Sequence, residues 1–84
     1  MKPETYTCLV WMNSQYIGKP IDSIPVPDCC AILGLVRQDN LILAASNPVI
    51  EEEDYLIAVA MNPQILPELK HCLNRTQQLH WKPT

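Results

Sequence analysis

Arg37 is the side chain in this sequence that could most readily do chemistry. It ends a strongly apolar segment and stands directly before a polar turn. In such a place a planar guanidinium, with its five N–H donors, can bind an anion without being buried. Arg37 can equally be a charge that merely terminates a strand. The residues around it leave both interpretations open.

The acidic run at residues 51–54 is a second candidate, because carboxylate oxygens are the ligands that Ca²⁺ prefers. The run lacks the interleaved spacing and the glycine of a calcium loop. A solvated connector that keeps two hydrophobic strands from aggregating is the favoured interpretation. Cation binding stays an alternative, and we predict no metal ligands.

The pattern contains no catalytic constellation. His71 and His80 lie on or after the last predicted helix and have no flanking motif for acid–base or nucleophilic catalysis. Gly18 and Gly34 are sixteen positions apart, which excludes a phosphate-binding glycine loop. We therefore expect no enzyme, no catalytic residues and no cofactor.

Four cysteines are present, at positions 8, 29, 30 and 72, and no two of them form a C-x-x-C pair. Adjacent residues Cys29 and Cys30 would point to opposite faces of a strand. Reduced thiols that serve as small apolar side chains are the favoured interpretation.

Length and composition define the setting for these residues. A chain of 84 residues has room for one domain, and so small a domain leaves much of its surface exposed, which favours oligomerisation. Apolar residues are 48% of the chain and charged residues 18%, so it should fold. A net charge of -3 with six Lys and Arg argues against nucleic acid as a partner. Without a spanning run or a signal peptide, the chain is predicted to be cytoplasmic.

The apolar segments predict an α+β fold with a small mixed sheet of about four to five strands. The segment at 29–36 is an unbroken apolar run, typical of a strand buried on both faces. Polar residues 37–40 form the turn of a hairpin, and Asn47-Pro48 marks a second turn. The predicted strands are residues 5–12, 29–36, 41–45 and 55–61.

The remaining segments predict one helical turn and one helix. The loop at 13–28 contains three of the chain's eight prolines and has room for one helical turn, at residues 20–24. A short turn over residues 62–66 should precede a helix from Pro67, because Pro67 would break a helix begun at Pro63. Its apolar stripe is Ile65, Leu69, Cys72 and Leu73. We expect one domain over residues 1–84, with its core at 5–73 and a tail at 74–84.

The order of these elements resembles the RCK C-terminal (TrkA-C) domain family. That family's pattern has a G-K-x-hydrophobic-x-x-hydrophobic element, a strand closing on Arg, a hairpin leading to a Pro, and a G-D-x-hydrophobic strand. The resemblance covers roughly residues 5–73. Glu53 departs from it, since the family usually has Gly before the aspartate. The matching residues here are Gly18, Lys19, Ile21, Ile24, Arg37, Pro48 and Asp54.

The resemblance implies a cytoplasmic homodimer that regulates a K⁺ or other ion channel or transporter, either covalently linked to it or docked on it at the inner face of the membrane. In several family members the dimer cleft binds cyclic di-AMP. A two-fold ligand with two phosphates suits a two-fold dimer that offers one Arg37 from each chain. By position in the family pattern, the other lining residues are Asn40, Leu41, Ile42 and Pro48. A ligand-free structural dimerisation module is the alternative.

Overall fold

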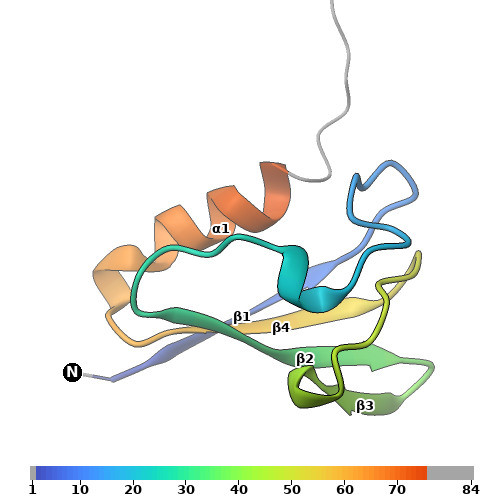
Figure 1. The fold of residues 1–84 in the computed structure, drawn as a ribbon. Coiled ribbons are helices and arrows are strands. Elements are labelled where there is room, and N and C mark those ends of the chain that lie inside the picture. The colour runs from blue at the N-terminus through green and yellow to red at the C-terminus, as the bar shows by residue number, and fades with distance from the viewer. Residues whose placement is uncertain (1, 76–84) are drawn as a thin grey trace, which may run out of the picture.

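A computed structural model describes residues 2–75 of the chain, and the predictions for His80 and for residues 76–84 lie outside this range. Within it, four strands form one sheet and a single α-helix follows them (Figure 1). The α+β class is confirmed. In chain order, with η for one turn of 3-10 helix, the elements are β1 (Glu4–Leu9), η1 (Ile21–Ser23), β2 (Cys30–Arg37), β3 (Asn40–Leu43), η2 (Ala44–Ser46), β4 (Tyr55–Ala60), η3 (Pro63–Ile65) and α1 (Leu66–Arg75).

The sheet has the order β1-β4-β2-β3, so β4 lies between β1 and β2. All three pairings are antiparallel, and the prediction of a mixed sheet is therefore wrong. β1 and β2 run in the same direction, but β4 lies between them and is antiparallel to both, so no two hydrogen-bonded neighbours are parallel. Along β4 the side chains alternate, and Leu56, Ala58 and Ala60 are buried on one face.

The β2–β3 hairpin confirms the predicted turn. Gln38 and Asp39 have φ of 51° and 66°, the left-handed pair that matches the twist of the flanking strands in a two-residue hairpin. The predicted strand at 41–45 is shorter than expected. β3 ends at Leu43 because the chain then forms η2, which Asn47 closes with φ of 46°.

The start of the C-terminal helix also agrees with the prediction. The Asn62 side chain accepts a hydrogen bond of 2.9 Å from the Gln64 backbone N–H, which caps η3. Pro67 then stands in the first turn of α1, where a missing N–H costs no helical bond. Leu69 and Leu73 of the predicted stripe are fully buried, whereas Cys72 and Ile65 are half-buried.

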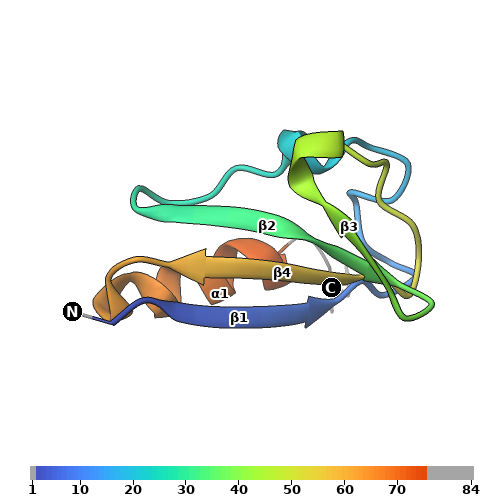
Figure 2. The ribbon, with the colours of Figure 1, turned by 90° about the horizontal axis from the view of Figure 1, so that it is seen from below.

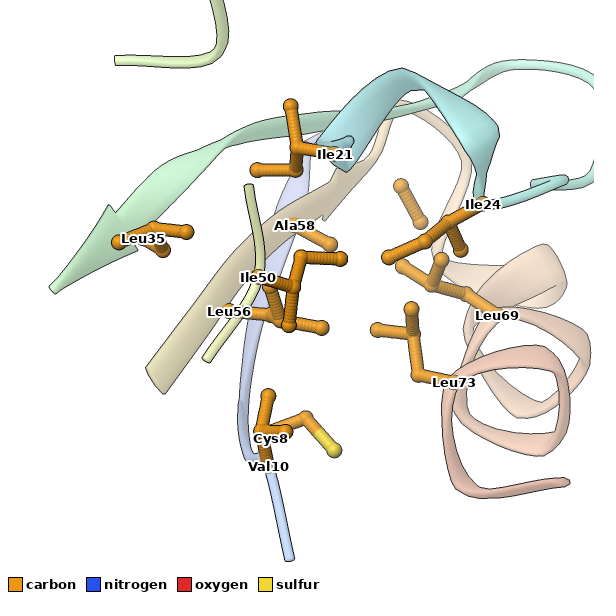
Figure 3. Close-up of a cluster of buried hydrophobic side chains, with 11 residues drawn as sticks. Cys8, Val10, Ile21, Ile24, Leu35, Ile50, Leu56, Ala58, Leu69 and Leu73 are labelled. Carbon is orange, nitrogen blue, oxygen red and sulfur yellow. The ribbon is translucent and has the colours of Figure 1, made fainter. Parts of the chain in front are cut away.

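The core lies between one face of the sheet and a layer made of α1 and the segment around η1. Figure 3 shows Leu69 and Leu73 pointing from α1 toward Ile50 and Leu56. The buried apolar residues are Cys8, Val10, Ile21, Ile24, Leu35, Ile50, Leu56, Ala58, Ala60, Leu69 and Leu73.

The prediction that residues 29–36 form a strand buried on both faces is wrong for this chain. Ala31 and Leu33 are exposed, because the layer of helix and turns covers one face of the sheet alone. An irregularity between Ile32 and Gly34 inserts Leu33 as an extra residue opposite β4. β2 is therefore apolar on an open face as well as on a buried one.

The connector at 51–54 is a tight turn with a strained residue. The Asp54 N–H donates to the Glu51 carbonyl at 3.2 Å, and Glu53 has φ of 73°. A positive φ at the third of four residues marks a type II turn, which favours glycine at that position. Glu53 therefore adopts a conformation that a glycine would adopt with less strain. The solvated connector is confirmed for residues 51–53 but not for Asp54, which is buried.

We predict that Glu53→Gly stabilises the domain. A left-handed conformation costs a residue with a Cβ about 1–2 kcal/mol, and the extra flexibility of an unfolded glycine returns about 0.5–1 kcal/mol of that. Urea unfolding should therefore give a free energy of unfolding higher by about 0.5–1 kcal/mol. Glu52→Gly is the control: Glu52 has no positive φ, so this variant should be less stable than the parent chain. Equal effects of the two changes would contradict the prediction.

Candidate functional site

The candidate site is the junction formed by Arg37, Val49, Glu51 and Asp54. Its position follows from the antiparallel pairing of β2 with β4, in which Val36 lies opposite Tyr55. The last residue of β2 is Arg37, and Asp54 is the residue directly before β4. The antiparallel pairing therefore places the Arg37 side chain at the end of β2 beside the Asp54 carboxylate at the start of β4.

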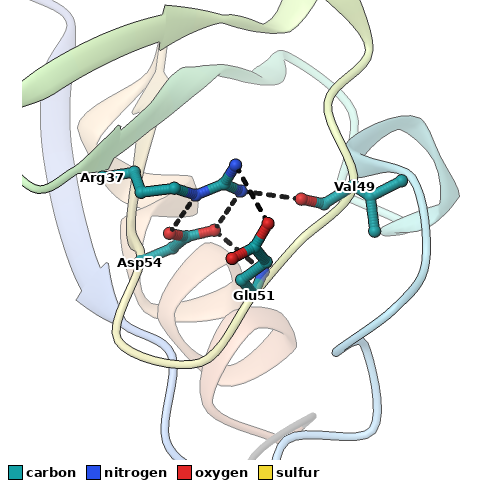
Figure 4. A network of polar contacts seen from close by, with 4 residues as sticks. All are labelled: Arg37, Val49, Glu51 and Asp54. Carbon is teal, nitrogen blue, oxygen red and sulfur yellow. Dashed lines mark hydrogen bonds and ion pairs between the residues drawn. The ribbon is translucent and has the colours of Figure 1, made fainter.

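The Arg37 guanidinium makes a bidentate contact with the Asp54 carboxylate (Figure 4). Its Nε donates to Oδ1 at 2.9 Å, and its Nη2 donates to Oδ2 at 2.8 Å. Nη2 also donates to the Val49 carbonyl at 2.8 Å, and Nη1 lies 3.2 Å from Oε2 of Glu51. The hydrogen bonds to Asp54 raise the pKa of Arg37 above its ordinary value.

Asp54 is the residue that makes this contact necessary. It is 1% exposed, and its Oδ2 also accepts a hydrogen bond of 2.8 Å from the Glu51 backbone N–H. A buried carboxylate is unfavourable unless a cation and hydrogen-bond donors replace its water. Arg37 supplies the cation and two donors. Its main role in the isolated chain is thus to neutralise Asp54.

The charges at the junction limit what it can bind. One guanidinium faces two carboxylates, those of Glu51 and Asp54, so the formal charge of the group is negative. An anionic ligand is repelled by this sum unless a carboxylate moves away. Glu51 is the carboxylate that can move, since its side chain is 61% exposed and contacts the outer nitrogen Nη1.

The loop that follows β1 is tied to the same junction by backbone hydrogen bonds. Gly18 N–H donates to the Ile50 carbonyl at 2.8 Å, and Ile50 N–H donates to the Lys19 carbonyl at 2.9 Å. Ile21 N–H donates to the Pro48 carbonyl at 2.9 Å. Gly18 has φ of 88°, a conformation that L side chains rarely adopt. Residues that lie some thirty positions apart in the sequence thus form one short ladder.

The predicted ligand residues do not all face one place within the chain. Arg37 and Pro48 lie close to the junction, and Asn40 is opposite Arg37 in the hairpin. Leu41 and Ile42 are neighbours on β3, so their side chains point to opposite faces of the sheet. Leu41 is exposed and Ile42 packs against the core.

A small hollow is lined by residues of β2, of η2 and of the segment around η1. None of the predicted ligand residues is among them. Its volume is about 160 Å³, below the roughly 300–1,000 Å³ of sites that hold small molecules. It can accept an apolar side chain but not a dinucleotide. The lining residues are Ile21, Asp22, Ile24, Val26, Ile32 and Ala44.

The other candidate groups do not converge. Among residues 2–75 no three His, Cys, Asp or Glu side chains are placed to hold a metal ion, and the carboxylates of Glu51 and Asp54 contact Arg37 instead. His71 is an exposed residue of α1. None of the four cysteines is in a disulfide, in agreement with the predicted thiols. In the same part of the chain no helix is long and apolar enough to cross a membrane.

The Arg37–Asp54 pair is the part of the site that sequence reasoning missed. Both residues were recognised separately, as a strand end and as a strand start. The strand order accounts for the pair: β2 and β4 are antiparallel neighbours, so the end of β2 lies beside the start of β4. Comparison with known proteins adds no further assignment: no family model matches the chain, and no curated protein matches it.

We predict that Arg37→Met lowers the free energy of unfolding by about 3 kcal/mol or more, because it leaves the Asp54 carboxylate buried without a cation. Adding Asp54→Asn to Arg37→Met should recover part of this loss, since the amide is uncharged and its oxygen can still accept from Glu51 N–H. Chemical denaturation of the single and double variants measures both effects.

Lys2→Met is the control for Arg37→Met, because it removes an exposed cation far from Asp54 and should change stability by no more than about 0.5 kcal/mol. A double variant as unstable as the sum of its single changes would show that Arg37 and Asp54 act independently.

We predict slow alkylation of Cys30 at pH 8. Burial raises the pKa of the Cys30 thiol, and the neighbouring Cys29 adds to this effect. Because the thiolate is the reactive form, Cys30 stays protonated and should react more slowly than the exposed Cys29. The raised pKa also means that folding opposes ionisation, so Cys30 lowers stability as the pH rises above the ordinary thiol value. Mass spectrometry of Cys29→Ser and Cys30→Ser chains treated with iodoacetamide separates the two rates, and equal rates would contradict this.

Proposed function

We propose that this chain is a non-enzymatic regulatory domain of the RCK C-terminal type, which acts as a cytoplasmic homodimer. In this proposal it senses a small ligand and biases a K⁺ or other ion-transport system at the inner face of the membrane, either covalently linked to it or docked on it. Binding at the two-fold interface would change the relative orientation of the two chains and so the state of the transporter.

The observation that carries this proposal is the convergence of the family-like residues. The Ile21 backbone N–H donates to the Pro48 carbonyl, and the Arg37 side chain bonds to Asp54. Each of these contacts joins one part of the family pattern to another. If the short motifs matched the family by chance, their residues would not be expected to contact one another. Motifs that belong to one fold are expected to do so. The contact network therefore supports the resemblance on which the function rests.

The size of the ligand supports a site between two chains. The hollow of about 160 Å³ is too small for cyclic di-AMP, and Leu41 and Ile42 face opposite sides of the sheet. A ligand that touches Arg37, Asn40 and these residues must lie over the hairpin edge and needs a second chain to enclose it. Two copies would supply two guanidinium groups for two phosphates.

Glu51 would then act as a competitor of the ligand. Nε and Nη2 of Arg37 are bonded to Asp54 and Val49, so a phosphate would approach Nη1 and displace the exposed Glu51 carboxylate. Arg37 can then hold Asp54 and the phosphate at the same time. The affinity for the ligand is set in part by the strength of the Arg37–Glu51 contact.

A ligand-free structural dimerisation module is the second candidate, and the use of Arg37 inside the chain favours it. Most of the donors of Arg37 serve Asp54, Val49 and Glu51. In this version Arg37 terminates β2 and holds the fold, and the dimer needs nothing else. The two candidates differ in whether any ligand stabilises the protein.

We predict that Glu51→Gln binds cyclic di-AMP about fivefold more tightly than the parent chain. The change removes one exposed charge near the phosphate, and two charges about 4 Å apart in water interact by about 1 kcal/mol. Isothermal titration calorimetry at about 100 μM protein measures the difference. Arg37→Ala is avoided as the main test, because it also removes the partner of buried Asp54.

Glu52→Gln is the matched control, since it makes the same change of charge at the adjacent exposed residue, which does not contact Arg37. Its affinity should change by less than about twofold. Absence of heat in all three titrations, with no rise of the melting temperature in the presence of cyclic di-AMP, would refute nucleotide binding and favour the ligand-free module.

A further inference from the structure

Two of the cysteines come from elements of different layers, the sheet and the helix that covers it. Cys30 is the first residue of β2, and Cys72 lies in the second turn of α1. Both side chains are half-buried, and neither is in a disulfide. Neither belongs to the junction around Arg37, so the proposed function leaves both thiols without a role.

The side chain of Cys30 points toward the layer that contains α1. Side chains alternate along β2: Ala31 is exposed on the open face, whereas Cys30 and Ile32 pack against the core. Register places Cys30 opposite Ala60, at the end of β4 from which the chain continues through η3 into α1. Figure 2 shows β4 between β1 and β2, with α1 behind the strands. Cys30 therefore lies on the face of the sheet that α1 covers.

The side of α1 that faces β1 is identified by contacts with two residues of that strand. Nζ of Lys70 lies 5.5 Å from the centre of the Tyr6 ring. One turn later, the Asn74 amide donates to the Tyr6 hydroxyl at 3.1 Å, and the Cys8 thiol donates to Oδ1 of Asn74 at 3.5 Å. Residues 70 and 74 therefore lie on the β1 side of the helix.

Cys72 lies on the other side of α1, toward β2. Leu69 and Leu73 point into the core. Since successive residues of a helix are about 100° apart, Glu68 and Cys72 lie on the side of this pair that is turned away from β1. Because β4 separates β1 from β2, that side faces β2. The electrostatics agree: burial raises the pKa of the Cys30 thiol, and the nearby Cys72 and Glu68 raise it further.

We infer that Cys30 and Cys72 are a redox-sensitive pair, which hydrogen peroxide converts to a disulfide and which a thiol such as glutathione restores. Disulfides that form in a reducing cytosol are usually transient and act as redox sensors. The bond would tie the first residue of β2 to α1 and so restrain the helix on the sheet. This modification site goes beyond the proposed function, because it needs neither a ligand nor a second chain.

Cys72 is the thiol that reacts first, because burial raises the pKa of Cys30 and leaves less of the reactive thiolate there. The Cys72 thiolate attacks one oxygen of hydrogen peroxide, the O–O bond breaks, and hydroxide leaves and takes up a proton to become water. Cys72 is then a sulfenic acid. The Cys30 thiolate attacks this sulfur, so that an S–S bond forms, the S–O bond breaks and a second hydroxide leaves as water. Two thiols have lost two electrons and two protons, and one peroxide has become two water molecules.

Peptide mapping of the full chain after treatment with hydrogen peroxide at low micromolar protein tests the inference. Trypsin releases residues 71–75, in which Cys72 is the single cysteine. After oxidation this peptide should be found joined to the peptide that contains Cys30, and dithiothreitol should separate the two. The bond closes a loop of about forty residues, so the melting temperature should rise by roughly 10–20 °C and return on reduction.

Cys29→Ser is the matched control, because it removes the adjacent exposed thiol and should leave the linked peptides and the rise in melting temperature unchanged. Cys72→Ser should abolish both effects. Cys30→Ser should do the same and serves as a second variant if Cys72→Ser does not fold. Circular dichroism verifies the fold of each variant.

Three outcomes overturn the inference. The first is an oxidised chain in which the peptide with Cys72 stays unlinked. The second is a link that persists in Cys30→Ser or disappears in Cys29→Ser, which would assign the bond to another cysteine. The third is a link between two chains, which a non-reducing gel shows as a covalent dimer.

Discussion

The buried carboxylate of Asp54 is the constraint on which the rest of the structure depends. At 1% exposure it requires a cation, and Arg37 provides one from the end of the neighbouring strand. The same guanidinium holds the Val49 carbonyl, so the segment between β3 and β4 is fixed as well. That segment in turn forms the ladder with Gly18 and Lys19. One ion pair thus joins the hairpin, the acidic turn and the loop after β1.

This arrangement changes the meaning of the family-like residues. Gly18 permits a left-handed backbone, Pro48 and Lys19 offer their carbonyls, and Arg37 and Asp54 neutralise each other. All five stabilise the fold directly. The residues that resemble the family pattern therefore have structural roles in this chain, and these contacts leave mainly the Nη1 side of the Arg37 guanidinium, next to the exposed Glu51 carboxylate, accessible.

The sheet is covered on only one of its two faces, which is a consequence of the short chain. One helix and three short turns can cover a single face of four strands, and in the described residues that face is the one toward Leu56 and Leu69. Domains are usually built from two layers around one core, and here both layers exist, but large apolar residues such as Leu33, Leu41 and Leu43 stay exposed.

Local sequence patterns were sufficient to predict the secondary-structure elements. Each of them depends on residues that are near one another in the sequence, as the hairpin turn, the capped start of the helix and its apolar stripe illustrate. The strands at 29–36 and 55–61 and the turn before Pro67 were predicted to within one or two residues. Strand direction, the open face beside Leu33 and the pairing of Arg37 with Asp54 depend on which strands become neighbours. That is decided when the layer of α1 and η1 packs on one face, so only the tertiary structure determined whether Arg37 faces solvent or a buried carboxylate.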